Sequence, residues 1–187
     1  MARKLDQIIV IDVESTCWDG PPPAGQENEI IEIGLCTLDL GTLERVDRED
    51  IFVRPERSTV SAFCTDLTGL TQEQVASGVP FDQACAILKK RFRTKDRTWA
   101  SYGDYDRRQF ERQCGDRGIG CPFGPTHVNV KNLFALAFRL PREVGMAEAL
   151  DLLGRPLEGT HHRGGDDAWN IAGILATLLN KARGSGN

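Results

Sequence analysis

The chain has 187 residues, which is enough for one domain with a full hydrophobic core. Hydrophobic residues make up 40% of it and charged residues 27%, and the net charge of −4 argues against a protein that coats nucleic acid by charge alone. No apolar run approaches the roughly 20 residues that cross a bilayer, and the run at 8–11 is too short for a signal peptide, so we expect a cytoplasmic protein with no membrane contact.

The first part of the chain predicts three strands. Residues 7–13 (QIIVIDV) are apolar and β-branched, which is typical of a buried central strand. Residues 29–40 and 45–53 predict two more strands, and the turn at Gly41 predicts that these two form a hairpin. Between the first and second strands, Pro21–Pro23 and the glycines around them predict a loop.

Helices and strands alternate in the rest of the chain. The capping pattern at 71–74 predicts a short helix, and apolar spacing predicts a helix over 81–92. Further strands are predicted over 98–102 and 127–130, and further helices over 106–114, 132–138, 146–153 and 166–182. This order predicts an α/β domain, in which a central mixed five-stranded sheet is flanked by helices.

No repeat or long linker divides the sequence. We therefore expect a single domain over residues 1–183 and a disordered tail over 184–187. None of the six cysteines has the C-x-x-C spacing of a zinc or redox motif, so we expect reduced thiols that act as small apolar side chains. The basic stretches at 89–97 and 107–108 are interpreted as solvated surface, at least for the first of them.

Two carboxylates end the first predicted strand. Asp12 and Glu14 are two residues apart, so they project to the same side of the strand. Burying unpaired carboxylates is costly, and a divalent metal ion is their natural partner. A strand end that meets solvent would show the same pattern, so this motif does not decide the function by itself.

Two later segments add similar groups. Asp106 comes where a strand gives way to a helix, and Asp167 falls in the first turn of the last helix. Each of these aspartates is also explained as a helix cap. His162 lies five residues before Asp167, in a loop that two glycines are expected to make mobile. Together, four carboxylates from three segments suit Mg²⁺ or Mn²⁺ rather than zinc, and the histidine suits a general base.

In this order, the three motifs resemble those of the DEDDh exonucleases, the group of ribonuclease T and the epsilon subunit of DNA polymerase III. They read DVEST at 12–16, GDYDRRQF at 103–110 and HRGGDDAWNIA at 162–172. The segments FVRP at 52–55 and LTGLTQ at 67–72 also resemble the RNA-trimming branch related to the eukaryotic histone-mRNA exonuclease. The resemblance covers roughly residues 8–178.

The resemblance implies a ribonuclease-H-like fold and a phosphodiester hydrolase that shortens single-stranded RNA or DNA from its 3′ end. The four carboxylates at Asp12, Glu14, Asp106 and Asp167 resemble the ligands of two divalent ions, Mg²⁺ or Mn²⁺, and His162 resembles the general base. The implied reaction is two-metal hydrolysis, and its product is a nucleoside 5′-monophosphate.

Two of these assignments have neighbouring alternatives. His161 and Asp166 have the same spacing as His162 and Asp167, and the second pair is preferred because the family's second aspartate precedes an alanine. Similarly, Asp104 competes with Asp106. The latter is preferred because Phe110 follows Asp106 at the distance seen in the family, and its side chain can pack into the core.

A base-binding platform is expected beside the metal site, because apolar and aromatic side chains stack bases. Phe63 and Leu67, expected in a loop, resemble the base-contacting segment of the family, and Trp18 is a further candidate. Core packing or surface exposure also explains these residues. Two other functions remain open: a DNA-directed or proofreading-type exonuclease, and a non-catalytic nucleic-acid-binding scaffold. Protein partners are not predicted.

Overall fold

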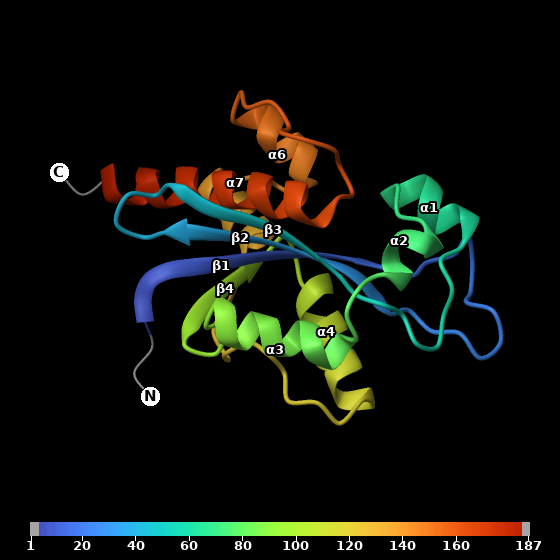
Figure 1. Cartoon of the computed structure of the whole chain (residues 1–187). Coiled ribbons are helices and arrows are strands. Elements are labelled where there is room, and N and C mark those ends of the chain that lie inside the picture. The colour runs from blue at the N-terminus through green and yellow to red at the C-terminus, as the bar shows by residue number, and fades with distance from the viewer. Residues whose placement is uncertain (1–3, 185–187) are drawn as a thin grey trace.

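A mixed five-stranded sheet forms the centre of the molecule in a computed structural model that describes residues 4–184 (Figure 1). The strands are β1 (Lys4–Ser15), β2 (Ile30–Asp39), β3 (Arg45–Phe52), β4 (Arg97–Ser101) and β5 (His127–Asn129), in the order β3-β2-β1-β4-β5. Strands β1, β2 and β3 pair antiparallel, whereas β4 runs parallel to both β1 and β5. The predicted mixed sheet, hairpin and central first strand are confirmed.

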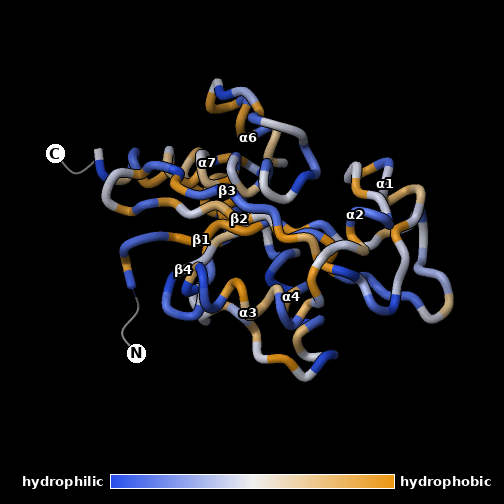
Figure 2. Tube along the Cα trace, viewed as in Figure 1, coloured by the Kyte–Doolittle hydropathy of each residue, from blue (hydrophilic) through white to orange (hydrophobic). Residues whose placement is uncertain are grey.

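Helices cover both faces of this sheet. They are α1 (Ala62–Thr68), α2 (Gln72–Ala76), α3 (Phe81–Arg91), α4 (Tyr105–Asp116), α5 (Val130–Ala137), α6 (Met146–Leu152) and α7 (Gly164–Gly184). Successive side chains of β1 enter opposite cores: Ile8 packs with α5, α6 and α7, whereas Ile9 packs with α3 and α4. Figure 2 shows apolar residues concentrated in the sheet and polar residues on the outer parts of the chain. Burial of this apolar surface is the main force that holds the layers together.

Helix α1 was not predicted, because Phe63 and Leu67 were expected in a loop. The side chain of Ser61 caps the helix by accepting a hydrogen bond from a backbone amide in the first turn. Gly69 ends the helix with a φ of 72°, in the left-handed region that glycine adopts without strain. Phe63 and Leu67 lie one helical turn apart and are each 42% exposed, but α1 has only 7 residues, which is too short for apolar spacing to indicate a helix.

The start of α7 lies directly against β2. A Cβ atom on Gly34 would lie only 1.7 Å from the carbonyl carbon of Gly164, so the two backbones meet at glycines. Gly164 and Gly165 are both buried in the first turn of α7. The two glycines were predicted to lie in a mobile loop, but the structure places them in the first turn of α7, where they allow close packing.

At its other end, α7 continues to Gly184, so the first residue of the predicted tail is helical. The rest of that tail, 185–187, lies outside the described residues. All six cysteines are free thiols. Within residues 4–184, no helix has both the length and the apolar character to cross a membrane.

Candidate active site

A cavity of about 340 Å³ lies beside the end of β1, where it meets the first turns of α4 and α7. Its lining includes all five predicted catalytic residues together with several others: Asp12, Glu14, Asp106, His162, Asp167, His161, Leu67, Tyr102, Tyr105 and Met146. The structure therefore brings three segments that are far apart in sequence to one place.

Three carboxylates in the cavity are close enough to share a cation. Asp12 and Glu14 follow one another on the same side of β1, and Asp167 reaches them from α7. One oxygen from each lies within 4.8 Å of the others. Glu14 is 8% exposed and Asp167 is 4% exposed, so little water reaches these groups.

The fourth carboxylate comes from the first turn of α4. Asp106 is 4% exposed, and its Oδ1 accepts a 2.9 Å hydrogen bond from the backbone amide of Val13. This bond holds α4 against β1 between the two strand carboxylates. Asp104 instead precedes the helix and forms an ion pair with Arg107 at 3.2 Å. Asp106, rather than Asp104, thus lines the cavity.

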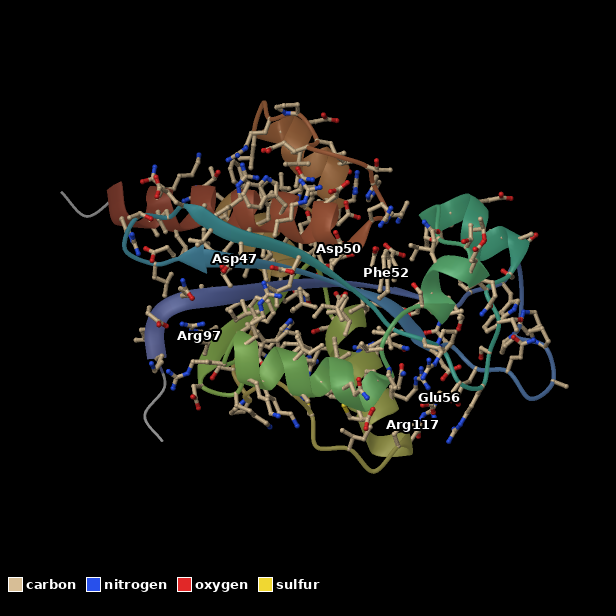
Figure 3. The ribbon with its side chains drawn as sticks, in the orientation of Figure 1. Asp47, Asp50, Phe52, Glu56, Arg97 and Arg117 are labelled. Atoms are coloured by element: carbon tan, nitrogen blue, oxygen red, sulfur yellow. The ribbon has the colours of Figure 1, made fainter. Side chains whose placement is uncertain are left out.

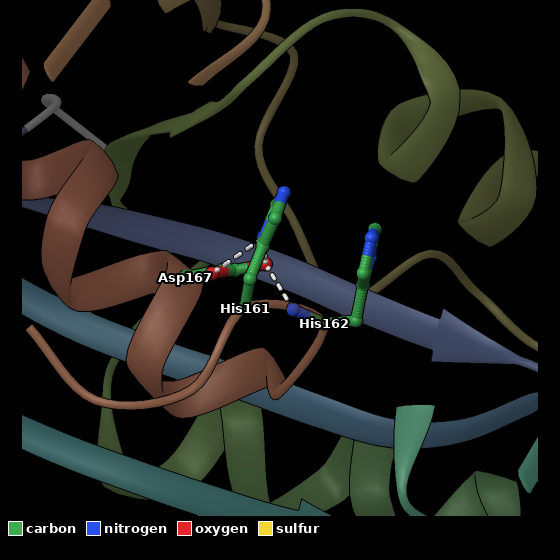
Figure 4. A group of neighbouring side chains, drawn as sticks. All are labelled: His161, His162 and Asp167. Carbon is green, nitrogen blue, oxygen red and sulfur yellow. Dashed lines mark hydrogen bonds and ion pairs between the residues drawn. The ribbon is translucent and has the colours of Figure 1, made fainter. Parts of the chain in front are cut away.

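Both neighbouring histidines approach Asp167 (Figure 4). The Nδ1 atom of His161 lies 3.0 Å from Oδ2 of Asp167, and the backbone amide of His162 donates a 3.0 Å hydrogen bond to the same oxygen. Their rings stack with centroids 4.0 Å apart. Asp166 points away from this site and forms an ion pair with Arg48. The contact between His161 and Asp167 was not predicted, because motif spacing alone does not show which histidine side chain faces the aspartate.

The carboxylates have pKa values above their ordinary range. Burial raises the pKa of Glu14 to about 9, and the nearby charges of Asp167 and Glu32 raise it further. Burial, followed by repulsion from Asp106 and Glu14, raises the pKa of Asp12 well above its usual value. Burial also raises the pKa of Asp106 to about 6, although the hydrogen bond from Val13 opposes this shift. These acids resist being charged together without a compensating cation.

The donor set fits a pair of hard divalent cations. Neither the Asp12 nor the Glu14 carboxylate receives a hydrogen bond from any residue in the described part of the chain. Buried carboxylates without such partners are costly. Clustered carboxylate oxygens are the ligands that Mg²⁺ and Mn²⁺ prefer, so such ions satisfy both the charge and the oxygen atoms.

His162 is suited to accept a proton. Burial, with a smaller contribution from His161, lowers its pKa, so its imidazole is neutral near pH 7. Its backbone has a φ of 63°, in the left-handed region that non-glycine residues rarely adopt. That conformation is held in place by the bond from its amide to Asp167.

Two acids that were not predicted, the buried Glu32 and the exposed Asp50, anchor the start of α7. Glu32 on β2 accepts a 2.8 Å hydrogen bond from the amide of Gly164 and forms an ion pair with Arg163 at 2.9 Å. Asp50 on β3, labelled in Figure 3, accepts a 2.7 Å bond from the amide of Gly165. Carboxylates at a helix N-terminus satisfy free amides and complement the helix dipole. For Glu32, the sequence did offer a signal, because an acidic residue within an otherwise apolar strand indicates a buried charge that needs a partner.

The predicted platform residues are placed differently from one another. Among the described residues, the cavity lining includes Leu67 but neither Phe63 nor Trp18. Two aromatic residues that were not predicted, Tyr102 and Tyr105, do line it, and Tyr105 is 53% exposed. Tyr105 lies within the second motif and Tyr102 directly precedes it, but the motif itself indicates only the aspartates.

Comparisons with known proteins show similarity to exonucleases over most of the chain. A family model described as exonuclease (RNase T) matches residues 9–175. Human 3'-5' exoribonuclease 1 is 35% identical, over 93% of this chain and 52% of its own length. The Drosophila melanogaster 3'-5' exonuclease Snipper is 27% identical, over 92% of this chain and 69% of its own. This chain thus spans about half the length of the human relative.

Solved structures show the same similarity. The nuclease domain of 3'hExo, described as a DEDDh family member bound to rAMP, superimposes with a TM-score of 0.86 at 31% identity, covering 96% of this chain and 95% of that one. A second structure, described as the 3'-end specific recognition of a histone mRNA stem-loop by 3'-exonuclease, has a TM-score of 0.83 at 31% identity. It covers 94% of this chain and 82% of its own.

Proposed function

The chain belongs to the RNase T family of exonucleases, and from this premise we propose that it removes nucleotides from the 3′ end of single-stranded RNA. Its predicted ribonuclease-H-like fold is confirmed by the likeness to the nuclease domain of 3'hExo. One observation carries the activity: the motif residues from β1, α4 and α7 converge in one cavity. The choice of RNA is supported by the human relative, which is named an exoribonuclease.

The carboxylates would hold two divalent ions, Mg²⁺ or Mn²⁺. Asp12, Glu14, Asp106 and Asp167 supply the oxygen ligands from three elements of the fold. When bound, such ions lower the pKa of a water molecule and stabilise the charge that develops on the leaving 3′-oxygen. The rigid hydrogen bond from Val13 to Asp106 keeps one ligand in position before ions or substrate arrive.

His162 would remove a proton from the attacking water. A new bond forms between the water oxygen and the terminal phosphorus as the bond from phosphorus to the 3′-oxygen breaks. The water proton passes to His162, and the leaving 3′-oxygen gains a proton from solvent. The product is a nucleoside 5′-monophosphate, and Leu67 and Tyr105 offer surfaces for its base.

A nuclease assay tests this proposal. Single-stranded RNA and DNA of the same sequence, labelled at the 5′ end, are incubated with the protein in Mg²⁺ or Mn²⁺. We expect a ladder of shortening RNA products and far less product from the Asp12→Asn variant, whose circular dichroism should match that of the wild type. Equally fast cutting of circular RNA would indicate an endonuclease. Faster loss of DNA would indicate a DNA-directed enzyme, and no hydrolysis with either ion would indicate a scaffold.

A further inference from the structure

His161 has no part in the proposed reaction, which needs only one histidine. Yet its side chain points at Asp167, beside His162 (Figure 4). A ring nitrogen from each histidine and a carboxylate oxygen of Asp167 all lie within 4.8 Å of one another. Two imidazoles and one carboxylate differ chemically from the all-oxygen cluster of Asp12, Glu14 and Asp167.

We propose that His161, His162 and Asp167 form a second site for a transition-metal ion of the Zn²⁺ type, which shares Asp167 with the carboxylate cluster, and that its occupancy inhibits the enzyme. Imidazole nitrogen is a preferred ligand of Zn²⁺, whereas Mg²⁺ takes oxygen ligands almost exclusively. Two histidines and one carboxylate, with a further position left to water, are a donor set known to bind zinc. The site is thus selective against the ions that the carboxylate cluster binds.

Side-chain rotation would form this site from the present arrangement. The two rings stack with an angle of 12° between their planes, and because imidazole lone pairs lie in the ring plane, the rings must tilt for both nitrogens to face one ion. Ligands about 2.1 Å from a tetrahedral zinc ion lie about 3.4 Å from each other. The donor atoms now lie up to 4.8 Å apart, so rotation of the side chains would have to shorten these distances to about 3.4 Å. The side chain of His161 is 43% exposed, so an ion has direct access from solvent.

Inhibition follows from the atoms that the ion would use, and this part rests on the proposed function. Zinc would occupy the lone pair with which His162 accepts the water proton. It would also draw Asp167 away from the hard ions. Because Asp167 belongs to both clusters, Zn²⁺ and Mn²⁺ should weaken each other's binding.

Metal binding without substrate tests the site independently of activity. Zn²⁺ affinity is measured by competition with a chromophoric chelator, and Mn²⁺ affinity by electron paramagnetic resonance, for wild type, His161→Gln and Asp12→Asn. We expect His161→Gln to weaken Zn²⁺ binding on the order of tenfold or more while keeping the affinity for Mn²⁺, because it removes one of three zinc ligands. Asp12→Asn should do the opposite. In a nuclease assay, Zn²⁺ should inhibit His161→Gln less than wild type, each relative to its own activity in Mg²⁺.

The opposite pattern would overturn the proposal. If His161→Gln binds Zn²⁺ as tightly as wild type, or if Asp12→Asn loses both ions, zinc occupies the carboxylate cluster instead. Circular dichroism verifies folding of each variant, and His161→Asn replaces His161→Gln if the latter does not fold. Failure of the proposed function would appear as no hydrolysis in Mg²⁺ by the wild type, whatever the binding of zinc.

Discussion

Glu14 lies near the end of the central strand with its carboxyl group buried, and burial raises the pKa of that group from 4.5 to about 9. The folded state therefore favours the protonated acid more than the unfolded chain does. The resulting stability is complete below pH 4.5 and is lost as the pH rises through about 9. Burial also raises the pKa of Asp106, to about 6, so its contribution to stability is likewise lost as the pH rises, at a lower pH than that of Glu14.

We therefore predict that the metal-free protein becomes less stable between pH 5 and pH 9. Melting temperatures in chelator should fall over this range, and Glu14→Gln should flatten the fall because glutamine does not ionise. Addition of Mn²⁺ should reduce the fall in the wild type, since the ion compensates the charges. A melting temperature in chelator that rises from pH 5 to pH 9 would contradict this account.

The two histidines offer a second test at the same scale. We predict that His162→Ala loses on the order of 10²–10⁴-fold in turnover, the usual contribution of a general base. His161→Ala should lose far less, because His161 stacks on His162 and contacts Asp167 but takes no proton in the proposed reaction. Turnover on 5′-labelled RNA at saturating Mg²⁺ measures both variants. Equal losses, or a greater loss for His161→Ala, would assign the base to His161.

At the scale of elements, prediction from sequence succeeded where a local run of residues indicates by itself which side chains are buried. The apolar run of β1 indicated a central strand, and Asp12 and Glu14 stood out because their charges interrupt it. Helix α1 was missed because its 7 residues are too few for an apolar period to be recognised in the sequence. The role of Glu32 was missed because it depends on the amide of Gly164, whose position is set by tertiary packing.

The contact between β2 and α7 yields a prediction about Gly34. Gly34→Ala should displace the start of α7, because the new Cβ would overlap the carbonyl of Gly164. Overpacking typically costs about 1–3 kcal/mol, and this clash with backbone should reach or exceed that range. Activity should fall with stability, since α7 carries Asp167. Urea unfolding and turnover are the measurements.

Gly115→Ala is the matched control for this change. Gly115 lies within α4, and a Cβ at that position would meet no atom within 4 Å. Because alanine favours a helix over glycine by up to about 1 kcal/mol, this variant should be unchanged or slightly more stable. If Gly34→Ala behaves like Gly115→Ala, the two backbones are not packed as closely as the structure indicates.

At the scale of the whole molecule, the fold holds like charges together. The cores on the two faces of the sheet bring Asp106 from α4 and Asp167 from α7 to the end of β1. The repulsion among these groups is offset by the packing energy of both layers. Divalent ions that bind only this folded arrangement should raise the melting temperature in a concentration-dependent way. One such ion, at about 100 times its dissociation constant, would add about 2.7 kcal/mol to the free energy of unfolding.

Asp106→Asn separates two effects of the Asp106 carboxylate: its repulsion of the other carboxylates in the metal-free protein and its role as a ligand of the ion. In chelator, the variant should melt at a higher temperature than wild type, because one repelling charge is gone. The asparagine oxygen still accepts the hydrogen bond that Val13 now donates to Asp106, so α4 remains attached to β1. In Mn²⁺ the variant should gain less stability than wild type, since one ligand is lost.

Asp104→Asn is the control. Asp104 pairs with Arg107 outside the cavity, so this variant should leave the Mn²⁺ shift in melting temperature unchanged. An undiminished Mn²⁺ shift in Asp106→Asn, together with a reduced one in Asp104→Asn, would transfer the metal-binding role to Asp104.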